Sequence, residues 1–200
     1  MKMNTKLGFY LFLSFMQIGC LQASGNALQY EIVPFDDSDA GMKEQLCVMI
    51  REDQEMAKIL DTNEKFMRQS YLSCPDLPYP VQSFVCRSTD GLAKIYGFIQ
   101  YSCHDQYSEY GEIKTIKEDA VGFINGLAVH KDYRGQGIAQ ALLHHVEDLC
   151  RSNGMWKLML FTGVDNDKAA RAYIRYGFNM YPGYSSVYSD IIMIKLIYEN

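Results

Sequence analysis

The segment from Val129 to Ala139 combines an arginine and two glycines in a way that could bind phosphate. It reads Val-His-Lys-Asp-Tyr-Arg-Gly-Gln-Gly-Ile-Ala, with Arg134, Gly135 and Gly137 at its centre. Glycines let the backbone approach a ligand closely, and the first N–H groups of a helix have no intrahelical partners. Together with the positive end of the helix dipole, such a turn can bind a pyrophosphate, and Arg134 can add charge at its rim. A Gly-x-Gly pair alone is also common in ordinary turns.

Two elements of different period flank this turn and must position it. Before the turn, apolar residues recur at even spacing, which predicts a strand, with Gly126 interrupting it as a bulge would. After the turn, apolar residues recur at helical spacing, so a helix is predicted from near Gly137 to the Ser-Asn-Gly at residues 152–154. The apolar positions are Val121, Phe123, Leu127 and Val129 in the strand and Ile138, Leu142, Val146 and Leu149 in the helix.

Two common phosphate-binding loops are excluded by the residues after the glycines. A Walker loop needs Lys-Ser or Lys-Thr there, and this chain has neither. The dinucleotide fingerprint needs a third glycine where this chain has Gln140. A different phosphate-containing ligand is therefore indicated.

The turn resembles the acyl-CoA signature of the GNAT superfamily of N-acetyltransferases, Arg/Gln-x-x-Gly-x-Gly/Ala. A second block further along the chain resembles the family's Asn-x-x-Ala, Tyr and Gly-Phe arrangement, in the same order. The resemblance covers about residue 30 to the C-terminus. The residues that carry it are Leu127, Ala128, Val129, His130, Arg134, Gly135, Gln136, Gly137, Ile138 and Ala139, then Asn166, Asp167, Lys168, Ala169, Tyr173, Gly177 and Phe178.

This resemblance implies a fold and a donor. The fold is a mixed α+β domain over residues 28–200, with a central, mostly antiparallel twisted sheet of six to seven strands flanked by about four helices. The signature strand and the next strand splay apart, and the pantetheine arm of acetyl-CoA lies in that gap. No metal is expected. The implied cofactor-binding residues are Leu127, Ala128, Val129, Arg134, Gly135, Gln136, Gly137, Ile138, Ala139 and Asn166.

The implied reaction is transfer of an acetyl group to a primary amine by direct attack in a ternary complex. An alkylamine is only about one part in a thousand neutral at pH 7, so the site must desolvate or deprotonate it. The thioester carbonyl needs polarising by a backbone N–H such as that of Val129. Tyr173 stands where the family's general acid stands, and would protonate the departing thiolate.

The general base is unassigned. Many relatives carry a glutamate two residues before the position of Leu127, but this chain has Asn125, which can orient a water and cannot take a proton. His130 is more easily explained by a capping or solvent-facing role, and His144 and His145 are expected to face solvent. The other candidates, which rest on proximity alone, are His104, Glu109 and Glu112; tyrosines that could line an acceptor pocket are Tyr71, Tyr79, Tyr101 and Tyr107.

Other functions stay open at this point. A GNAT-fold module that binds acyl-CoA without transferring the acyl group would fit the missing glutamate, and a donor other than acetyl-CoA is a further alternative. The acceptor is a small-molecule or peptide amine of unknown identity, and a homodimer is possible within the superfamily.

The N-terminus reads as a secretory signal peptide over residues 1–23. A basic start is followed by an apolar run at residues 7–19 and by the small residues Ala23 and Ser24. The run is too short for a permanent span, so no stable membrane span is expected after processing. Residues 18–20 faintly resemble a lipoprotein site. Initiation at Met16 would instead give a cytoplasmic enzyme, so the localisation is undecided between export and cytoplasm.

Composition fits one globular domain and narrows its partners. The 200 residues are 48% hydrophobic and 22% charged, enough to bury a core without disulfides or a metal. The net charge of -5 and the absence of a Lys/Arg run argue against nucleic acid as a partner. The cysteines have no CxxC spacing, which excludes common zinc and redox motifs. Cys86, Cys103 and Cys150 are expected to be buried free thiols.

The remaining elements follow from periodicity and turn residues. Strands are predicted at residues 30–34, 83–87, 95–101, 157–161 and 186–197, the last pairing with the segment near Phe178. Helices are predicted within residues 39–71, with a Met-rich core face, and at residues 167–176, starting near Asn166 or Asp165. Residues 74–80 and 104–119 are predicted to be loops.

Overall fold

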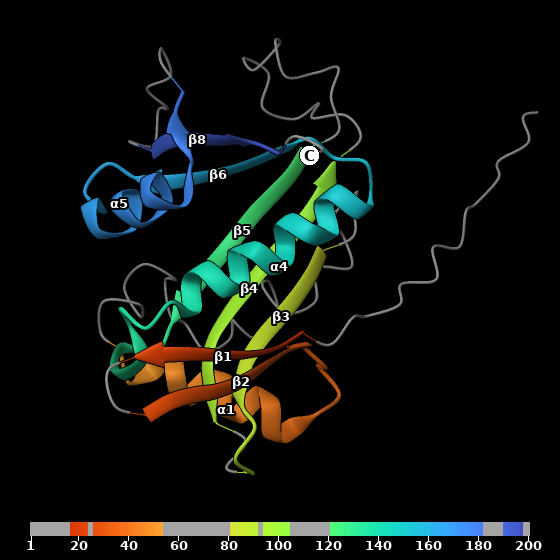
Figure 1. The fold of residues 1–200 in the computed structure, drawn as a ribbon, viewed down its shortest axis with the longest axis vertical. Helices are drawn as coiled ribbons and strands as arrows, with labels where there is room; N and C mark the ends of the chain where they lie inside the picture. Colours follow the sequence, from red (N-terminus) through yellow and green to blue (C-terminus); the bar gives the residue numbers. More distant parts are fainter. Residues whose placement is uncertain are drawn as a thin grey trace, which may run out of the picture.

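The computed structural model describes residues 17–23, 26–53, 81–91, 94–104, 121–181 and 190–197, and these residues form one mixed α+β fold (Figure 1). Their sheet has the order β1-β2-β3-β4-β5-β6-β8-β7, and all neighbours are antiparallel except β5 and β6. The strands are β1 (Gln17–Ala23), β2 (Asn26–Pro34), β3 (Val81–Ser88), β4 (Ile95–His104), β5 (Val121–Val129), β6 (Lys157–Gly163), β7 (Asn179–Met180) and β8 (Asp190–Leu196). The helices are α1 (Ala40–Arg51), the short 3-10 helix η3 (Lys131–Tyr133), α4 (Ile138–Ser152) and α5 (Asp167–Tyr176).

The predicted α+β class and mostly antiparallel sheet are confirmed. Each strand and helix predicted from periodicity is found where it falls on described residues, including the hairpin whose turn contains Gly91 at φ 82°. The sheet has more strands than the six to seven expected, because β1 adds to it. The expected loops at residues 74–80 and 105–119, and the part of the predicted helical region after residue 53, lie outside the described residues.

The two faces of the sheet carry separate helices. Along β4, Phe98 packs against α1 and the next residue, Ile99, packs against α4, as the alternation of a strand requires. The α1 face buries the predicted Met-rich surface of that helix through Met42, Leu46 and Met49. On the other face, α4 and α5 lie together over β3 to β6, as Figure 1 shows.

A glycine allows α4 to pack closely on the sheet. A Cβ atom at Gly97 in β4 would lie 2.9 Å from Cγ2 of Ile138 and 3.1 Å from Cδ1 of Leu142. Since real Cβ contacts are rarely this short, only glycine lets the first turns of α4 lie against β4. The start of α4 is thereby fixed over the centre of the sheet.

One buried carboxylate joins α4, α5 and β8. Glu147 of α4 is 3% exposed and accepts hydrogen bonds from Oη of Tyr176 and Nζ of Lys195, each at 2.6 Å. Arg151 adds a third contact at 2.6 Å to its other oxygen. Burial raises the pKa of this carboxyl, but the hydrogen bonds from Lys195 and Tyr176 outweigh burial and lower it overall. The charged network therefore fixes α5 against α4 at the surface of the core.

The prediction that His145 faces solvent is wrong. Its residue is 6% exposed, and its ring lies edge-on to Phe84 of β3 with 4.5 Å between centroids. Burial lowers the pKa of the imidazole. His144, its neighbour, is exposed as predicted. Adjacent residues on a helix point about 100° apart, so the boundary between the exposed and the buried face of α4 runs between His144 and His145. The sequence pattern alone did not locate this boundary.

Part of the segment interpreted as a signal peptide belongs to the sheet. Residues 17–23 form β1, which pairs along its whole length with β2, and β2 starts four residues earlier than predicted. Residues 1–16, with most of the apolar run, lie outside the described residues, so cleavage stays a prediction. Across the described ranges, no helix is both long and apolar enough to cross a membrane.

Candidate active site

The two central strands diverge after four residue pairs. The parallel pairing of β5 and β6 runs from Val121 with Lys157 to Ile124 with Leu160 and then stops. Beyond this point β5 stays paired only with β4, and β6 only with β8. Figure 1 shows the two strands separating toward the end where α4 begins. The splay that the resemblance implied is therefore present.

The backbone of β5 presents polar groups to this gap. The N–H of His130 donates to the carbonyl of Tyr96 on β4 at 2.9 Å. Because backbone groups alternate along a strand, residues 126 and 128 also bond toward β4, whereas Leu127 and Val129 direct their N–H and C=O groups to the other side. Those two residues are the ones expected to hold the pantetheine arm.

A bulge lies where the gap opens. The register between β4 and β5 skips one residue, since Gln100 pairs with Gly126 and Tyr101 pairs with Ile124. Asn125 therefore has no residue opposite it, and the bulge expected from Gly126 lies directly beside that glycine. Ser102 donates its Oγ to Oδ1 of Asn125 at 2.9 Å, which orients the asparagine side chain.

The turn between β5 and α4 has the shape of an anion cradle. Gly135 and Gly137 have φ angles of 76° and 82°, a region that favours glycine. Gly137 is the N-cap of α4 and no side chain caps the helix, whose first internal bond is from Ala141 to the Gly137 carbonyl. The N–H groups of Ile138, Ala139 and Gln140 are thus left for a ligand or solvent. Gln136 folds back, and its Nε2 donates to the Asp132 carbonyl at 3.2 Å.

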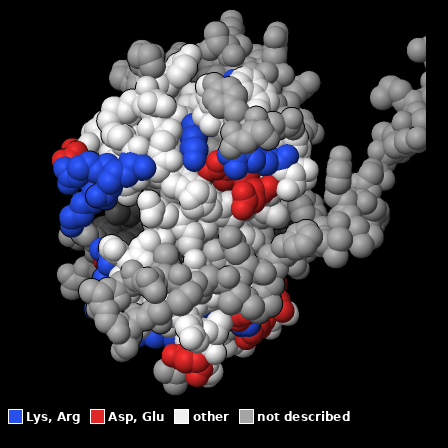
Figure 2. Space-filling view, in the orientation of Figure 1, with Lys and Arg blue, Asp and Glu red and all other residues white. Residues whose placement is uncertain are grey.

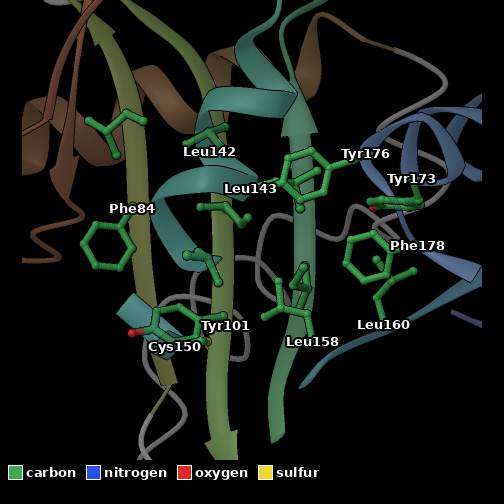
Figure 3. Packing of buried hydrophobic residues seen from close by; sticks show 14 of the residues in the cluster. Phe84, Tyr101, Leu142, Leu143, Cys150, Leu158, Leu160, Tyr173, Tyr176 and Phe178 are labelled. Carbon is green, nitrogen blue, oxygen red and sulfur yellow. The ribbon is translucent and has the colours of Figure 1, made fainter. Parts of the chain in front are cut away.

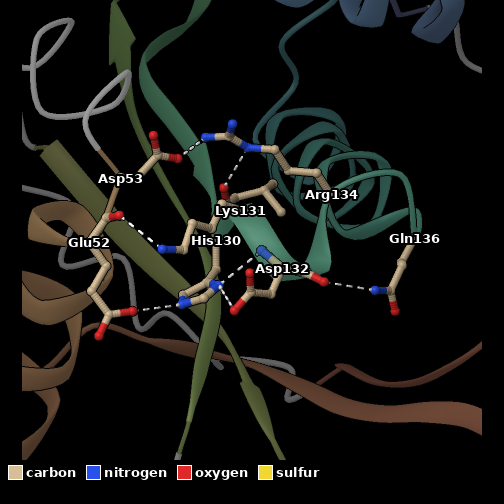
Figure 4. A network of polar contacts seen from close by, with 8 residues as sticks. Glu52, Asp53, His130, Lys131, Asp132, Arg134 and Gln136 are labelled. Carbon is tan, nitrogen blue, oxygen red and sulfur yellow. Dashed lines mark hydrogen bonds and ion pairs between the residues drawn. The ribbon is translucent and has the colours of Figure 1, made fainter.

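A polar network ties this turn to the end of α1, as Figure 4 shows. Arg134 donates from Nε to the Val129 carbonyl at 3.1 Å and forms a close ion pair with Asp53. Lys131 donates to the Glu52 carbonyl at 3.1 Å. Arg134 was expected at the rim of a pyrophosphate site; in this structure its guanidinium organises the turn itself.

His130 is buried and caps the short helix η3. It is 5% exposed, and its Nδ1 accepts a hydrogen bond from the N–H of Asp132 at 3.2 Å, which caps η3 as predicted. Since Nδ1 is the acceptor, the proton belongs on Nε2, which lies 3.5 Å from a Glu52 oxygen. Both ring nitrogens are occupied, so His130 is poorly placed to deprotonate an acceptor amine.

Helix α5 presents Asn166 and Tyr173 beside the gap. Oδ1 of Asn166 accepts from the N–H of Ala169 at 3.3 Å and so starts the helix. Tyr173 packs edge-on against Phe178 with 5.7 Å between centroids. Figure 3 shows its hydroxyl oxygen on the side of the ring that faces β5. Burial raises the pKa of this phenol to about 12, so it is fully protonated at neutral pH.

Basic side chains of α5 border a hollow. Lys168, Arg171 and Arg175 are all exposed on this helix. Figure 2 shows blue side chains gathered over α5 and the surface hollowed directly beside them, between α5 and the start of α4. Positive charge therefore lies on both sides of this hollow, from the α5 side chains and from the dipole of α4.

The remaining candidates for the general base and the acceptor pocket lie in the core or outside the described residues. Tyr101 is completely buried in the core and donates to Gln82 at 3.2 Å, so it does not line an acceptor pocket. The loop candidates Glu109, Glu112, Tyr71, Tyr79 and Tyr107, and the side chain of His104, lie outside the described part of the chain. Within that part, no cluster of metal-binding side chains is found.

Sequence reasoning missed Glu52 and Asp53. They follow a helix with no motif around them, and their partners are about 80 residues away along the chain. A buried aspartate is uncommon unless it is paired, so the 5% exposure of Asp53 marks this residue in the structure. The sequence does not show this burial, because it arises only in the folded chain. The one signal in the sequence is that two acidic residues, Glu52 and Asp53, directly follow the apolar positions of a predicted helix.

The chain is similar in sequence to a known protein family and to one of its characterised members. The acetyltransferase (GNAT) family matches residues 47–178, more than half of the chain. N-alpha-acetyltransferase 30 of Schizosaccharomyces pombe is 43% identical over 60 residues, which cover 30% of this chain and 40% of that protein. The chain thus aligns with well under two thirds of that relative.

Two solved structures share the fold. Arabidopsis thaliana NAA60 in complex with acetyl-CoA has a TM-score of 0.61 at 19% identity, covering 84% of this chain and 98% of that one. The NatC complex bound to Gag peptide and CoA contains a chain with a TM-score of 0.55 at 18% identity, covering 84% and 99%. With the family match, the splayed strands and the glycine turn, these findings show that the protein belongs to the GNAT family of acetyltransferases.

Proposed function

We propose that this protein transfers an acetyl group from acetyl-CoA to a primary amine by direct attack in a ternary complex. The observation that carries the proposal is a succession of backbone polar groups along one segment of the chain. It runs from the inward backbone groups of Leu127 and Val129 to the uncapped start of α4 at Gly137. A pantetheine arm and a pyrophosphate need these two kinds of partner in this order.

The residues present fit such a donor. The α4 N–H groups of Ile138 and Ala139, at a turn that Gly135 and Gly137 keep open, suit a pyrophosphate. Leu127 and Val129 suit the amides of the pantetheine arm, and Asn166 lies across the gap at the start of α5. Ala128 is buried in the core against α1, and Gln136 donates a hydrogen bond within the turn, to the carbonyl of Asp132.

When bound, acetyl-CoA would supply a thioester whose carbonyl carbon accepts the amine. The N–H of Val129 or of Leu127 would donate to the carbonyl oxygen as negative charge builds there. These donors are fixed by the β4 pairing, so no reorganisation is needed at the moment of reaction.

Tyr173 would act on the leaving thiolate. With its pKa raised to about 12, the phenol is a weaker acid than a thiol, whose ordinary pKa is about 8.5. Its contribution is therefore a hydrogen bond that stabilises the departing thiolate, which takes its proton from solvent once CoA has left the site.

The acceptor nitrogen would lose its proton through water. Asn125 stands at the bulge where the gap opens, and Ser102 fixes its oxygen, so its amide nitrogen is free to orient a water molecule near the reacting centre. Because Asn125 does not titrate, the neutral fraction of the amine should set the pH dependence of the rate.

The acceptor class we favour is the α-amine of a peptide or protein. The support is the 43% identity with a protein named for N-alpha acetylation, and the fold shared with a complex that holds a peptide. A peptide α-amine has a pKa of about 7.7–8.0, so a sizeable fraction is neutral without a strong base. That chemistry matches a site with asparagine in place of glutamate.

A matched peptide set tests this proposal. One peptide carries a free N-terminus and no lysine, and its partner carries a blocked N-terminus and one lysine. Acetylation is followed by product mass and by release of free CoA. We expect the free α-amine to be acetylated first, with a rate that falls in Tyr173→Phe. Binding of acetyl-CoA without transfer to either peptide or to a polyamine would instead favour a binding module.

A further inference from the structure

Two cysteines from different elements meet over Gly122, at the closed end of the strand gap. Cys103 of β4 pairs directly with Gly122 of β5 in the antiparallel register. Directly opposed residues point to the same face of a sheet, with Cβ atoms about 4.5–5.5 Å apart. Cys103 therefore projects to the face that α4 covers.

Cys150 reaches the same place from α4. A Cβ atom on Gly122 would clash with Sγ of Cys150 and would lie 3.5 Å from its Cβ. The absence of a side chain at Gly122 thus creates the space that the Cys150 thiol fills. Cys150 belongs to the core cluster under α4, where Figure 3 labels it, and Cys103 packs against the same cluster.

The pair is reduced in this structure, and nothing in the proposed acetyl transfer uses it. A disulfide needs Cβ atoms about 4 Å apart, and these two cysteines meet at the position of a single glycine, Gly122. We propose that Cys103 and Cys150 are an oxidisable pair, which closes to an intramolecular disulfide by exchange with a small disulfide. The sequence concealed this pair, because 46 residues separate the two cysteines.

Exposure sets the order of the steps. Cys103 is partly exposed, whereas Cys150 is completely buried. The Cys103 thiolate attacks one sulfur of the small disulfide, whose S–S bond breaks and releases one thiol. Cys150 then attacks the Cys103 sulfur of the mixed disulfide and releases the second thiol. The protein loses two electrons and two protons, and the small disulfide gains both.

The bond would join the end of β4 to the last turns of α4. Closing a loop of this length stabilises a fold mainly by restricting the unfolded chain. Gly122 lies two residues before the point where β5 and β6 part. The pair would therefore fix the closed end of the gap while leaving the turn at Gly135 and Gly137 unaltered.

The test treats the full-length reduced protein with glutathione disulfide at pH 8 and maps its peptides without reduction. We expect a peptide that links Cys103 to Cys150, and a melting temperature raised by about 5 °C or more and restored by dithiothreitol. Cys103→Ser should lose both effects, while Cys47→Ser, which removes a buried thiol of α1, should retain them.

The peptide map of the wild-type protein tests for the Cys103–Cys150 disulfide even if a variant folds poorly. Glutathione attached to Cys103 with no link to Cys150 would overturn the proposal. So would a link between other cysteines, or a raised melting temperature that persists in Cys103→Ser.

Discussion

Asp53, at the end of α1, forms an ion pair with Arg134, the arginine of the acyl-CoA signature. The side chain of Asp53 is 6% exposed and that of Arg134 is 41% exposed, so the ion pair is shielded from water on the aspartate side. Arg134 also holds the Val129 carbonyl through a second nitrogen. Arg134 thus connects the end of α1, the end of β5 and the glycine turn that precedes α4.

Arg134→Lys should weaken acetyl-CoA binding although the charge is retained. A lysine ammonium cannot reproduce two directed bonds from separate nitrogens of one planar group. Because Arg134 is half exposed, we expect a stability loss of about 1–2 kcal/mol and roughly tenfold weaker binding. Denaturant unfolding and calorimetric titration measure the two effects. Arg51→Lys is the control, since its pair with Glu44 is exposed on both sides. Equal acetyl-CoA affinities in wild type and Arg134→Lys would contradict the role given to this contact.

Tyr173→Phe should lower the rate of transfer while leaving acetyl-CoA affinity within about twofold. Loss of a proton or hydrogen-bond donor to the leaving group costs on the order of 100-fold in rate. The phenyl ring would keep its edge-on contact with Phe178, so the fold should survive. Tyr30→Phe, which removes a hydroxyl from a buried tyrosine of β2 away from the gap, should leave the rate unaltered. A fall in affinity equal to the fall in rate would mean that Tyr173 binds the donor only.

The sequence predicted the glycine turn between β5 and α4 well because local chemistry determines the shape of its backbone. Glycines with positive φ, an uncapped helix start and the change of period at Gly137 are all properties of a few neighbouring residues. The contacts of Asp53, Glu147 and the Cys103–Cys150 pair could not be predicted in this way. Each joins elements far apart along the chain, and their burial exists only once the sheet and helices have assembled.

The stability of the protein should fall as the pH drops below about 6.5, the ordinary pKa of histidine. Burial lowers the pKa of His145, so the unfolded chain binds a proton there at a pH where the folded chain does not. Stability is then lost progressively from the unfolded pKa down to the folded pKa. Glu147 adds a second loss at more acid pH, since its folded pKa is also lowered.

His145→Leu separates these two effects. Nε2 of His145 is buried without a hydrogen-bond partner, so a leucine removes an unsatisfied polar atom as well as the titration. We expect the variant to keep its stability between pH 7 and 5 and to lose it only in the range of Glu147. Thermal unfolding at stepped pH gives the comparison, with His144→Leu as the exposed control. An unchanged pH profile in His145→Leu would assign the loss to other groups.

Removal of residues 1–23 should destabilise the fold, whereas removal of residues 1–16 should leave it intact. Only the first deletion takes away β1, whose seven residues pair with β2. Loss of an edge strand exposes the backbone groups of β2 to solvent and to other chains. Thermal unfolding and light scattering of the two truncations measure the difference. Equal melting temperatures would show that β1 adds nothing to stability.

Calorimetric titration of acetyl-CoA into the full chain shows directly whether the glycine turn before α4 binds the acyl donor. Gly135→Glu places a carboxylate in the cradle, and Gly154→Glu makes the same change at the far end of α4; both glycines have positive φ and no atom within 4 Å of an added Cβ. We predict micromolar binding by the wild type and by Gly154→Glu, and at least about 100-fold weaker binding by Gly135→Glu. Equal binding by all three proteins, or none by a well-folded wild type, would show that this turn does not hold acetyl-CoA.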